Sequence, residues 1–82
     1  MNEEEFIKTL KQDNESLKGQ INFGIVNLQE KIEDFKKYNA RGEYETYHMF
    51  TIFQMTGYLL EKVSKINHND SMIDYILENS EE

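Results

Sequence analysis

The central part of the chain carries apolar side chains at intervals of three and four residues. This spacing repeats with the pitch of an α-helix and predicts a long helix over residues 15–40. Its apolar positions fill an arc of only about 80° around the helix, which is a narrow seam of the coiled-coil type. These positions are Leu17, Ile21, Ile25, Leu28, Ile32 and Phe35.

A second long helix is predicted over residues 43–67, and its apolar face is broader. The apolar positions there cover an arc of about 160°, which one antiparallel neighbour cannot bury. Two arrangements remain open: either shorter helices fold over this face, or a second subunit does. The apolar positions are Met49, Ile52, Phe53, Met55, Leu59, Leu60, Val63 and Ile66.

Shorter apolar patterns at the two ends predict short helices over residues 2–12 and 71–79. Asn2 is suited to cap the first of them, and the three glutamates that follow it lie at the positive end of the helix dipole. The polar runs 12–14 and 67–70 are interpreted as breaks that separate the short helices from the long ones.

The order of these elements predicts an all-α fold in a single domain, residues 1–82. Gly42 suits the end of the first long helix, because a left-handed residue commonly closes a helix. The two long helices then form an antiparallel hairpin with short N- and C-terminal helices, assembled into an oligomeric helical bundle. Gly24 and Gly57 fall at one level, which predicts a close helix crossing there. The same register pairs Leu28 with Phe53, Ile32 with Met49 and Ile21 with Leu60.

Composition narrows the class of protein and its partners. The chain has no Pro and no Cys, 12% aromatic residues and a net charge of −7. Free nucleic acid is not an expected partner, because phosphate binding needs a basic patch. No apolar run approaches the roughly 18 residues of a membrane-spanning helix, and the N-terminus lacks the pattern of a signal peptide. These features lead us to expect a cytoplasmic protein.

Groups that could carry catalysis are scarce. The sequence has neither a glycine-rich phosphate loop nor a serine nucleophile motif, and its two histidines are His48 and His68. Glu45 and His48 form one Glu-x-x-His motif, whereas a di-iron bundle needs two of them and two further glutamates. We therefore expect no enzymatic activity, no metal site and no cofactor.

The second long helix carries the residue types that are common at binding surfaces. Tyrosines at positions 38, 44, 47 and 58 surround it, and each combines an aromatic ring with a hydroxyl group. They are expected either to line the boundary of the core or to contact a partner. The residues expected at an oligomer interface are Phe50, Phe53, Gly57, Tyr58 and Leu60.

Three segments carry a resemblance to a known family: Phe6-Ile-Lys-Thr-Leu10, Leu17-Lys18-Gly-Gln-Ile21, and Phe53-Gln54 with Gly57-Tyr58. Between residues 6 and 63 the chain resembles the phage anti-CBASS sponge proteins, small helical oligomers that sequester cyclic di- and trinucleotides. The resemblance implies that Phe6 stacks on a base and that Lys18 meets a phosphate. It also implies that Tyr44 or Tyr47 takes the place of a tryptophan, and Lys62 that of an arginine.

Three functions follow from these observations as hypotheses. The first is a nucleotide sponge of a phage, which acts against a host defence and binds its ligand through Phe6 and Lys18. The second is an inhibitor directed at a host or defence protein, to which it presents an acidic helical surface as a mimic of nucleic acid. The third is a structural oligomerisation module that binds no ligand.

Overall fold

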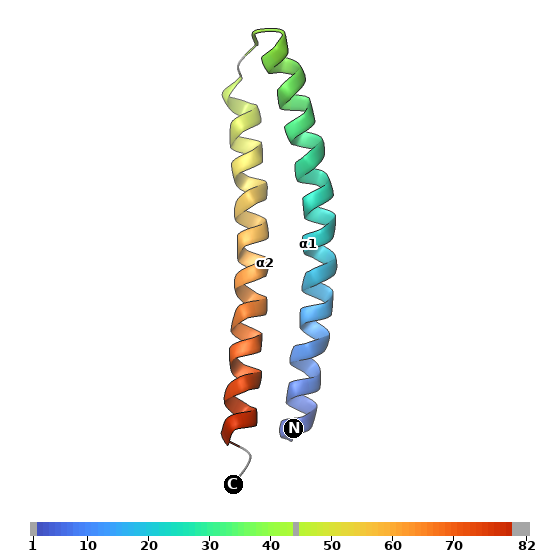
Figure 1. Cartoon of the computed structure of the whole chain (residues 1–82), viewed down its shortest axis with the longest axis vertical. Coiled ribbons are helices and arrows are strands. Elements are labelled where there is room, and N and C mark those ends of the chain that lie inside the picture. The colour runs from blue at the N-terminus through green and yellow to red at the C-terminus, as the bar shows by residue number, and fades with distance from the viewer. Residues whose placement is uncertain (1, 44, 80–82) are drawn as a thin grey trace.

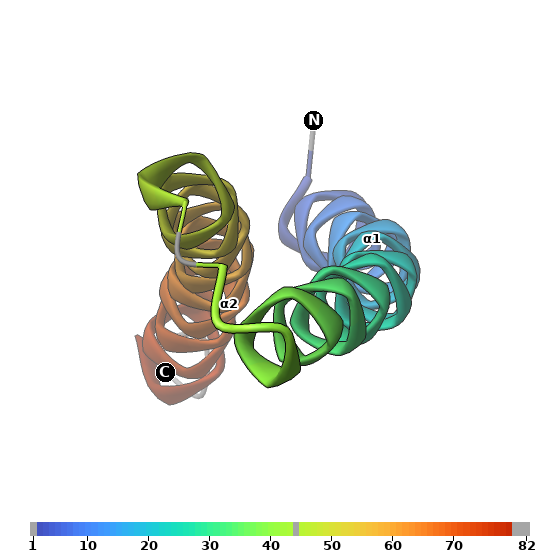
Figure 2. The same ribbon diagram turned by 90° about the horizontal axis from the view of Figure 1, so that it is seen from above.

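A computed structural model, which describes residues 2–43 and 45–79, shows that the protein consists of two long α-helices. Helix α1 spans Glu3–Ala40 and helix α2 spans Thr46–Asn79, and no strand occurs in this described part. The helices run antiparallel and side by side, with both chain ends at the same end of the molecule (Figure 1). The molecule measures 65 × 16 × 15 Å. Seen end-on, it is a single pair of helices (Figure 2).

Both ends of α1 are closed by local hydrogen bonds that the sequence encodes. At the start, the side-chain oxygen of Asn2 accepts a hydrogen bond of 2.8 Å from the backbone N–H of Glu5. At the end, Gly42 adopts a φ of 74°, and its N–H donates to the carbonyl of Asn39. The N–H of Glu43 donates to the carbonyl of Tyr38 at 2.9 Å. These two bonds form a Schellman motif, so Gly42 ends α1 as its sequence position predicts.

The predicted break at residues 12–14 is wrong. Helix α1 continues through these residues without interruption, so the expected helices 2–12 and 15–40 are one element of 38 residues. The polar side chains that suggested a break are instead used between the helices, where Asp13 and Asn14 form hydrogen bonds with α2. Because those contacts satisfy the side chains, they do not compete with the helical backbone.

The predicted break at residues 67–70 is wrong for the same reason. The expected helices 43–67 and 71–79 are joined in α2, which begins at Thr46. Asn69 and Asp70 bind across to α1 through their side chains. A tertiary contact therefore decides the local structure at both polar runs.

The seam between the helices follows a seven-residue repeat. On α1 the buried positions are Leu10, Asn14, Leu17 and Gly24, at steps of four, three and seven residues. Asn14 is hydrogen-bonded to Asn69, and Gly24 lies against Leu59. Gly24 comes ten residues after Asn14, and Leu59 comes ten residues before Asn69, so both contacts follow one antiparallel register. The predicted register set Gly24 level with Gly57 and is therefore displaced by two residues.

The side chains of α2 that the predicted register paired with α1 do not lie in the seam. The side chains expected opposite α1 are largely exposed: Met49, Phe53 and Leu60. The expected close approach of two glycines is also wrong. A Cβ atom on Gly24 would lie 2.7 Å from Cδ2 of Leu59, whereas a Cβ atom on Gly57 would meet nothing within 4 Å.

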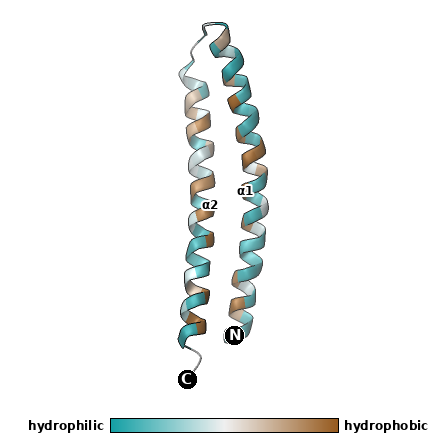
Figure 3. Ribbon diagram, in the orientation of Figure 1, coloured by the Kyte–Doolittle hydropathy of each residue, from teal (hydrophilic) through white to brown (hydrophobic). Residues whose placement is uncertain are grey.

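Burial is concentrated in the half of the hairpin that holds the chain ends. The buried hydrophobic residues of the described chain are Leu10, Leu17 and Ile73, and none of them is completely enclosed. Among the described residues between Ile25 and Tyr58, which form the half nearer the connection, none is buried. In that half α2 carries many hydrophobic positions, whereas α1 is mostly hydrophilic (Figure 3).

Candidate interaction surface

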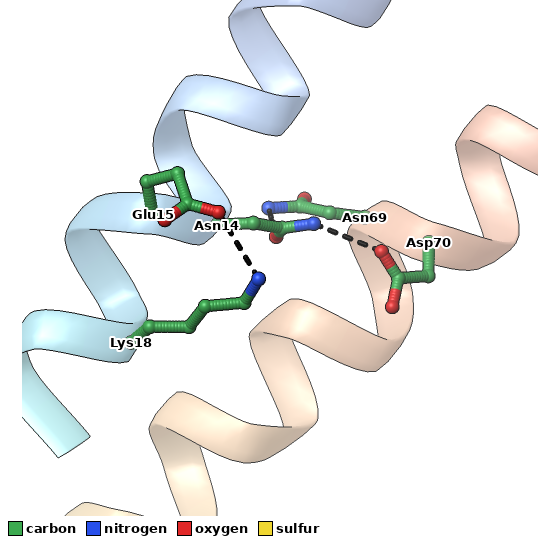
Figure 4. Close-up of polar contacts among 5 residues, drawn as sticks. All are labelled: Asn14, Glu15, Lys18, Asn69 and Asp70. Atoms are coloured by element: carbon green, nitrogen blue, oxygen red, sulfur yellow. Dashed lines mark hydrogen bonds and ion pairs between the residues drawn. The ribbon is translucent and has the colours of Figure 1, made fainter. Parts of the chain in front are cut away.

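A buried pair of asparagines connects the helices near the chain ends (Figure 4). The side-chain amide of Asn69 donates to Oδ1 of Asn14 at 2.9 Å and to Oδ2 of Asp13 at 2.8 Å. The amide of Asn14 donates to Oδ1 of Asp70 at 2.9 Å. Buried polar groups with complete partners of this kind fix the register of paired helices, since any slip would leave them without partners.

A groove of about 460 Å³ lies beside this pair and contains Lys18, one of the predicted ligand residues. The ammonium of Lys18 is 3.0 Å from Oε1 of Glu15 on the same helix (Figure 4). Lys11 also lines the groove, and Asp70 and Asp74 line its α2 side. Two lysines thus face three carboxylates, so within one chain the groove is not basic.

The other predicted ligand residues lie in separate places. Phe6 is half-buried on α1, twelve residues before Lys18, which corresponds to about 18 Å along the helix. Lys62 lies on α2 with its ammonium 4.8 Å from the ring centre of Tyr58. Tyr47 is exposed near the start of α2, and Tyr44 lies outside the described residues. One chain therefore does not bring this set together.

An exposed row of apolar side chains runs along the first half of α2. We call Met49, Phe53, Leu60 and Val63 the α2 stripe, because they follow one another at steps of four, seven and three residues. Phe53 and Leu60 are 76% and 66% exposed. Phe50 borders the stripe and lines a shallow pocket with Thr46, Met49 and Phe53. Of the residues expected at an interface, Phe50, Phe53 and Leu60 are therefore largely exposed in the single hairpin.

The α2 stripe continues a line of polar residues on the same face of the hairpin. Seven residues make nearly two helical turns, so Val63 shares its face with Asp70, and Leu60 shares its face with Asn67 and Asp74. On α1 the same steps lead from Lys18 to Ile25 and Ile32, which are both exposed. Because Lys18, Asp70 and Asp74 line one groove, Ile25 and Ile32 lie on the same side as the stripe. This face is polar near the chain ends and apolar near the connection.

Tyr58 lies on the opposite side of the hairpin. Together with Phe23, Gly24 and Gln54 it lines a shallow pocket of about 330 Å³. Its hydroxyl lies 3.5 Å from the side-chain oxygen of Gln20. The structure therefore separates Tyr58 from the other residues expected at an interface.

A cluster of aromatic rings packs where the two helices are connected. The rings of Tyr38 and His48 stack with centres 4.3 Å apart, and the guanidinium of Arg41 lies 4.6 Å above Tyr38. Nε2 of His48 is buried, forms no hydrogen bond and lies 3.7 Å from a carboxylate oxygen of Glu45. His48 thus joins the helices by packing, in addition to being part of the Glu-x-x-His motif.

The described residues offer few other kinds of site. Residues 2–43 and 45–79 contain no group of three or more acidic or histidine side chains arranged to hold a metal ion. Neither described helix is apolar enough over its length to cross a membrane. Comparison with protein-family models, curated proteins and solved structures finds no match for the chain.

The asparagine pair was not predicted from the sequence, although a signal for it is present. The spacing of three and four residues continues through Leu10, Asn14 and Leu17, and again through Ile66, Asn69 and Ile73. Only the polarity of the two asparagines conceals the repeat. A search that allows one polar residue at an inward position of a heptad would find both.

Proposed function

We propose that this chain is a non-enzymatic binding protein that works as an antiparallel helical hairpin assembled into an oligomeric bundle. The observation that carries the proposal is the composition of α2 from Thr46 to Leu60. This segment contains no Asp, Glu, Lys or Arg, whereas 30% of the whole chain is charged. Exposed apolar surface without charge is typical of a protein contact surface.

The proposed ligand is a cyclic di- or trinucleotide, which the protein sequesters in the cytoplasm. If the chain is phage-encoded, this is the cytoplasm of the host cell. The resemblance of residues 6–63 to anti-CBASS sponge proteins supports this ligand, with Phe6 stacking on a base and Lys18 meeting a phosphate. Because the groove at Lys18 holds more carboxylates than lysines, an anionic ligand needs further groups from another subunit. Tyr47 and Lys62 are the proposed contributors, so the pocket forms between chains.

A thermal-shift screen against cyclic di- and trinucleotides tests this proposal. A ligand at about 100 times its dissociation constant adds roughly 2.7 kcal/mol to the stability, which raises Tm by about 15 °C in a domain this small. The variant Lys18→Ala should lose the shift. The matched control is Lys36→Ala, because both lysines are exposed and pair with a glutamate three residues earlier, at 3.0 and 3.2 Å. A panel without any shift, or an equal loss in both variants, contradicts the proposed ligand.

A second candidate function is favoured by the negative charge at the end of the hairpin where α1 begins and α2 ends. Residues 2–15 and 68–79 carry eight acidic side chains and only two lysines. An acidic helical end of this kind suits an inhibitor that docks on a basic surface of a host or defence protein. This function predicts binding to a basic protein that weakens steeply with salt, together with no response to cyclic nucleotides.

A further inference from the structure

The single hairpin exposes more surface than a folded chain of its mass normally does. Its accessible surface is 6438 Å², whereas the size relation for folded monomers gives about 5,200 Å² for 9.8 kDa. The difference is about 1,200 Å² for each chain. A standard interface buries about 800 Å² on each partner, so the excess is large enough for a stable contact.

Part of the exposed apolar surface lies on the α2 stripe, and Phe23 and Tyr75 are exposed elsewhere on the hairpin. The stripe differs from those single residues because it is continuous and nearly symmetric about its own centre. Thr46, Met49, Phe53, Thr56, Leu60, Val63 and Asn67 follow one another at alternating steps of three and four residues. Read from either end, this row begins with a polar residue, has two large apolar residues next and reaches Thr56 at the centre. A row of this kind is complementary to a reversed copy of itself, which is the requirement for a two-fold contact.

We propose that two copies of this chain pair antiparallel through their α2 stripes, with the two-fold axis at the level of Thr56 and Gly57. In this arrangement Phe53 of each copy lies opposite Leu60 of the other, and Met49 lies opposite Val63. The two hairpins then form a four-helix bundle. The proposal rests on the self-association put forward above and specifies its surface and direction.

Charge decides between the antiparallel and the parallel direction. Residues 2–15 and 68–79 carry eight acids against two bases, whereas the described residues from 16 to 67 carry six acids against seven bases. Parallel pairing would set two strongly acidic ends side by side. Antiparallel pairing places them at opposite ends of a molecule 65 Å long, well beyond the screening length of about 8 Å at physiological salt.

Packing within the chain favours a second copy over a small ligand on this surface. Among the described residues from Ile25 to Tyr58 none is buried, so this half of the hairpin lacks a core of its own. Ile25 and Ile32 extend the exposed apolar surface from α2 onto α1. A helix pair of the same length covers the whole of this surface, which a small molecule cannot do.

Disulfide trapping tests both the surface and the direction, because the chain contains no Cys of its own. The variants are Phe53→Cys, Leu60→Cys and Thr56→Cys. Phe53 and Leu60 are 76% and 66% exposed in the single hairpin, so neither belongs to the buried seam between α1 and α2. The control is Phe23→Cys, which is 70% exposed but lies on the Tyr58 side of the hairpin. Each variant is oxidised alone and in equimolar mixtures, and the products are identified by mass spectrometry.

Antiparallel pairing predicts that a mixture of Phe53→Cys and Leu60→Cys gives mainly the mixed disulfide, and that Thr56→Cys alone gives a homodimer. Phe53→Cys alone stays reduced, since its two copies are seven residues apart along the axis, about 10.5 Å, beyond the reach of a disulfide. Phe23→Cys also stays reduced.

Efficient homodimers of Phe53→Cys and of Leu60→Cys would overturn the antiparallel direction while leaving self-association intact. A monomer mass in solution with no cross-link in any variant would overturn the self-association itself. Cross-linking of Phe23→Cys as fast as the stripe variants would overturn the assignment of the surface.

Discussion

The asparagine pair between α1 and α2 offers the sharpest test of how this hairpin is held together. Replacing Asn69 by Leu removes the hydrogen bonds to Asn14 and Asp13, which measure 2.9 and 2.8 Å. Asp13 is exposed and can turn to water, whereas Asn14 is buried and its Oδ1 loses its partner. A buried polar group left without a partner costs about 1–3 kcal/mol. We therefore expect Asn69→Leu to lower the free energy of unfolding by about 2 kcal/mol.

The double variant Asn14→Leu with Asn69→Leu should be much less destabilised than the sum of the two single changes. In it both buried amides are gone, and two apolar side chains of similar size meet in the seam. The released Asp70 is exposed and remains hydrated. The coupling energy between the two positions should therefore be about 1–3 kcal/mol, with a sign that favours the double variant.

Urea unfolding followed by circular dichroism measures these differences, at one fixed protein concentration because association shifts the midpoint. A loss of 2 kcal/mol corresponds to a fall in Tm of about 10 °C for a domain this small. The matched control is Asn22→Leu at an exposed position of α1, which should change stability by less than about 0.5 kcal/mol. Single variants that are as stable as the control, or costs that simply add, would refute the role of the pair.

Further predictions concern the glycines. Gly19→Ala should raise the free energy of unfolding by about 0.5–1 kcal/mol, because Ala favours the helix and its Cβ meets nothing within 4 Å. Gly24→Ala should gain less than Gly19→Ala, because the new Cβ would lie 2.7 Å from Cδ2 of Leu59 and that side chain must move. Thermal melts of the two variants compare them directly, and an equal gain in both would contradict the close contact. Gly42→Ala should cost about 1 kcal/mol because of its φ of 74°, and Gly42→Asn should cost less; both are measured by urea unfolding.

Helical periodicity was sufficient to predict the all-α class and most of the helical residues. It was also sufficient for the end of α1, where Gly42 adopts the left-handed conformation that its position suggests. The prediction failed at residues 12–14 and 67–70, because runs of Asp and Asn favour breaks when each is considered alone. These two runs lie opposite each other in the hairpin and satisfy each other's side chains. A contact between positions more than fifty residues apart cannot be found from local propensity.

The register of the two helices was predicted two residues away from its observed value for a related reason. The prediction maximised apolar pairs and placed Gly24 level with Gly57. In the structure the asparagine pair sets the level, and Gly24 lies against Leu59. The α2 members of the predicted pairs, Met49, Phe53 and Leu60, are largely exposed instead. Satisfying two buried polar groups therefore outweighed the count of apolar pairs.

The candidate site was predicted less well than the fold, since residue types indicate a kind of contact but not which residues converge. Phe6, Lys18 and Lys62 were grouped by the family resemblance, and one chain keeps them apart. Phe53 and Leu60 were selected because the apolar face was too broad for one neighbour, and both are exposed. The width of an apolar face therefore indicated an exposed surface, whereas single polar and aromatic residues did not define a pocket.

The two halves of the hairpin divide specificity and association between them. The half with the chain ends holds the asparagine pair and the buried residues Leu10, Leu17 and Ile73, so it fixes which residues of α1 and α2 meet. The other half has the uncharged segment of α2 and no buried residue among those described between Ile25 and Tyr58. If two copies pair as proposed, this second half gains its core only in the dimer. Dimer formation and the ordering of that half are then one equilibrium. The asparagine pair fixes the register of α1 and α2 in each copy, so the two copies meet in a single geometry.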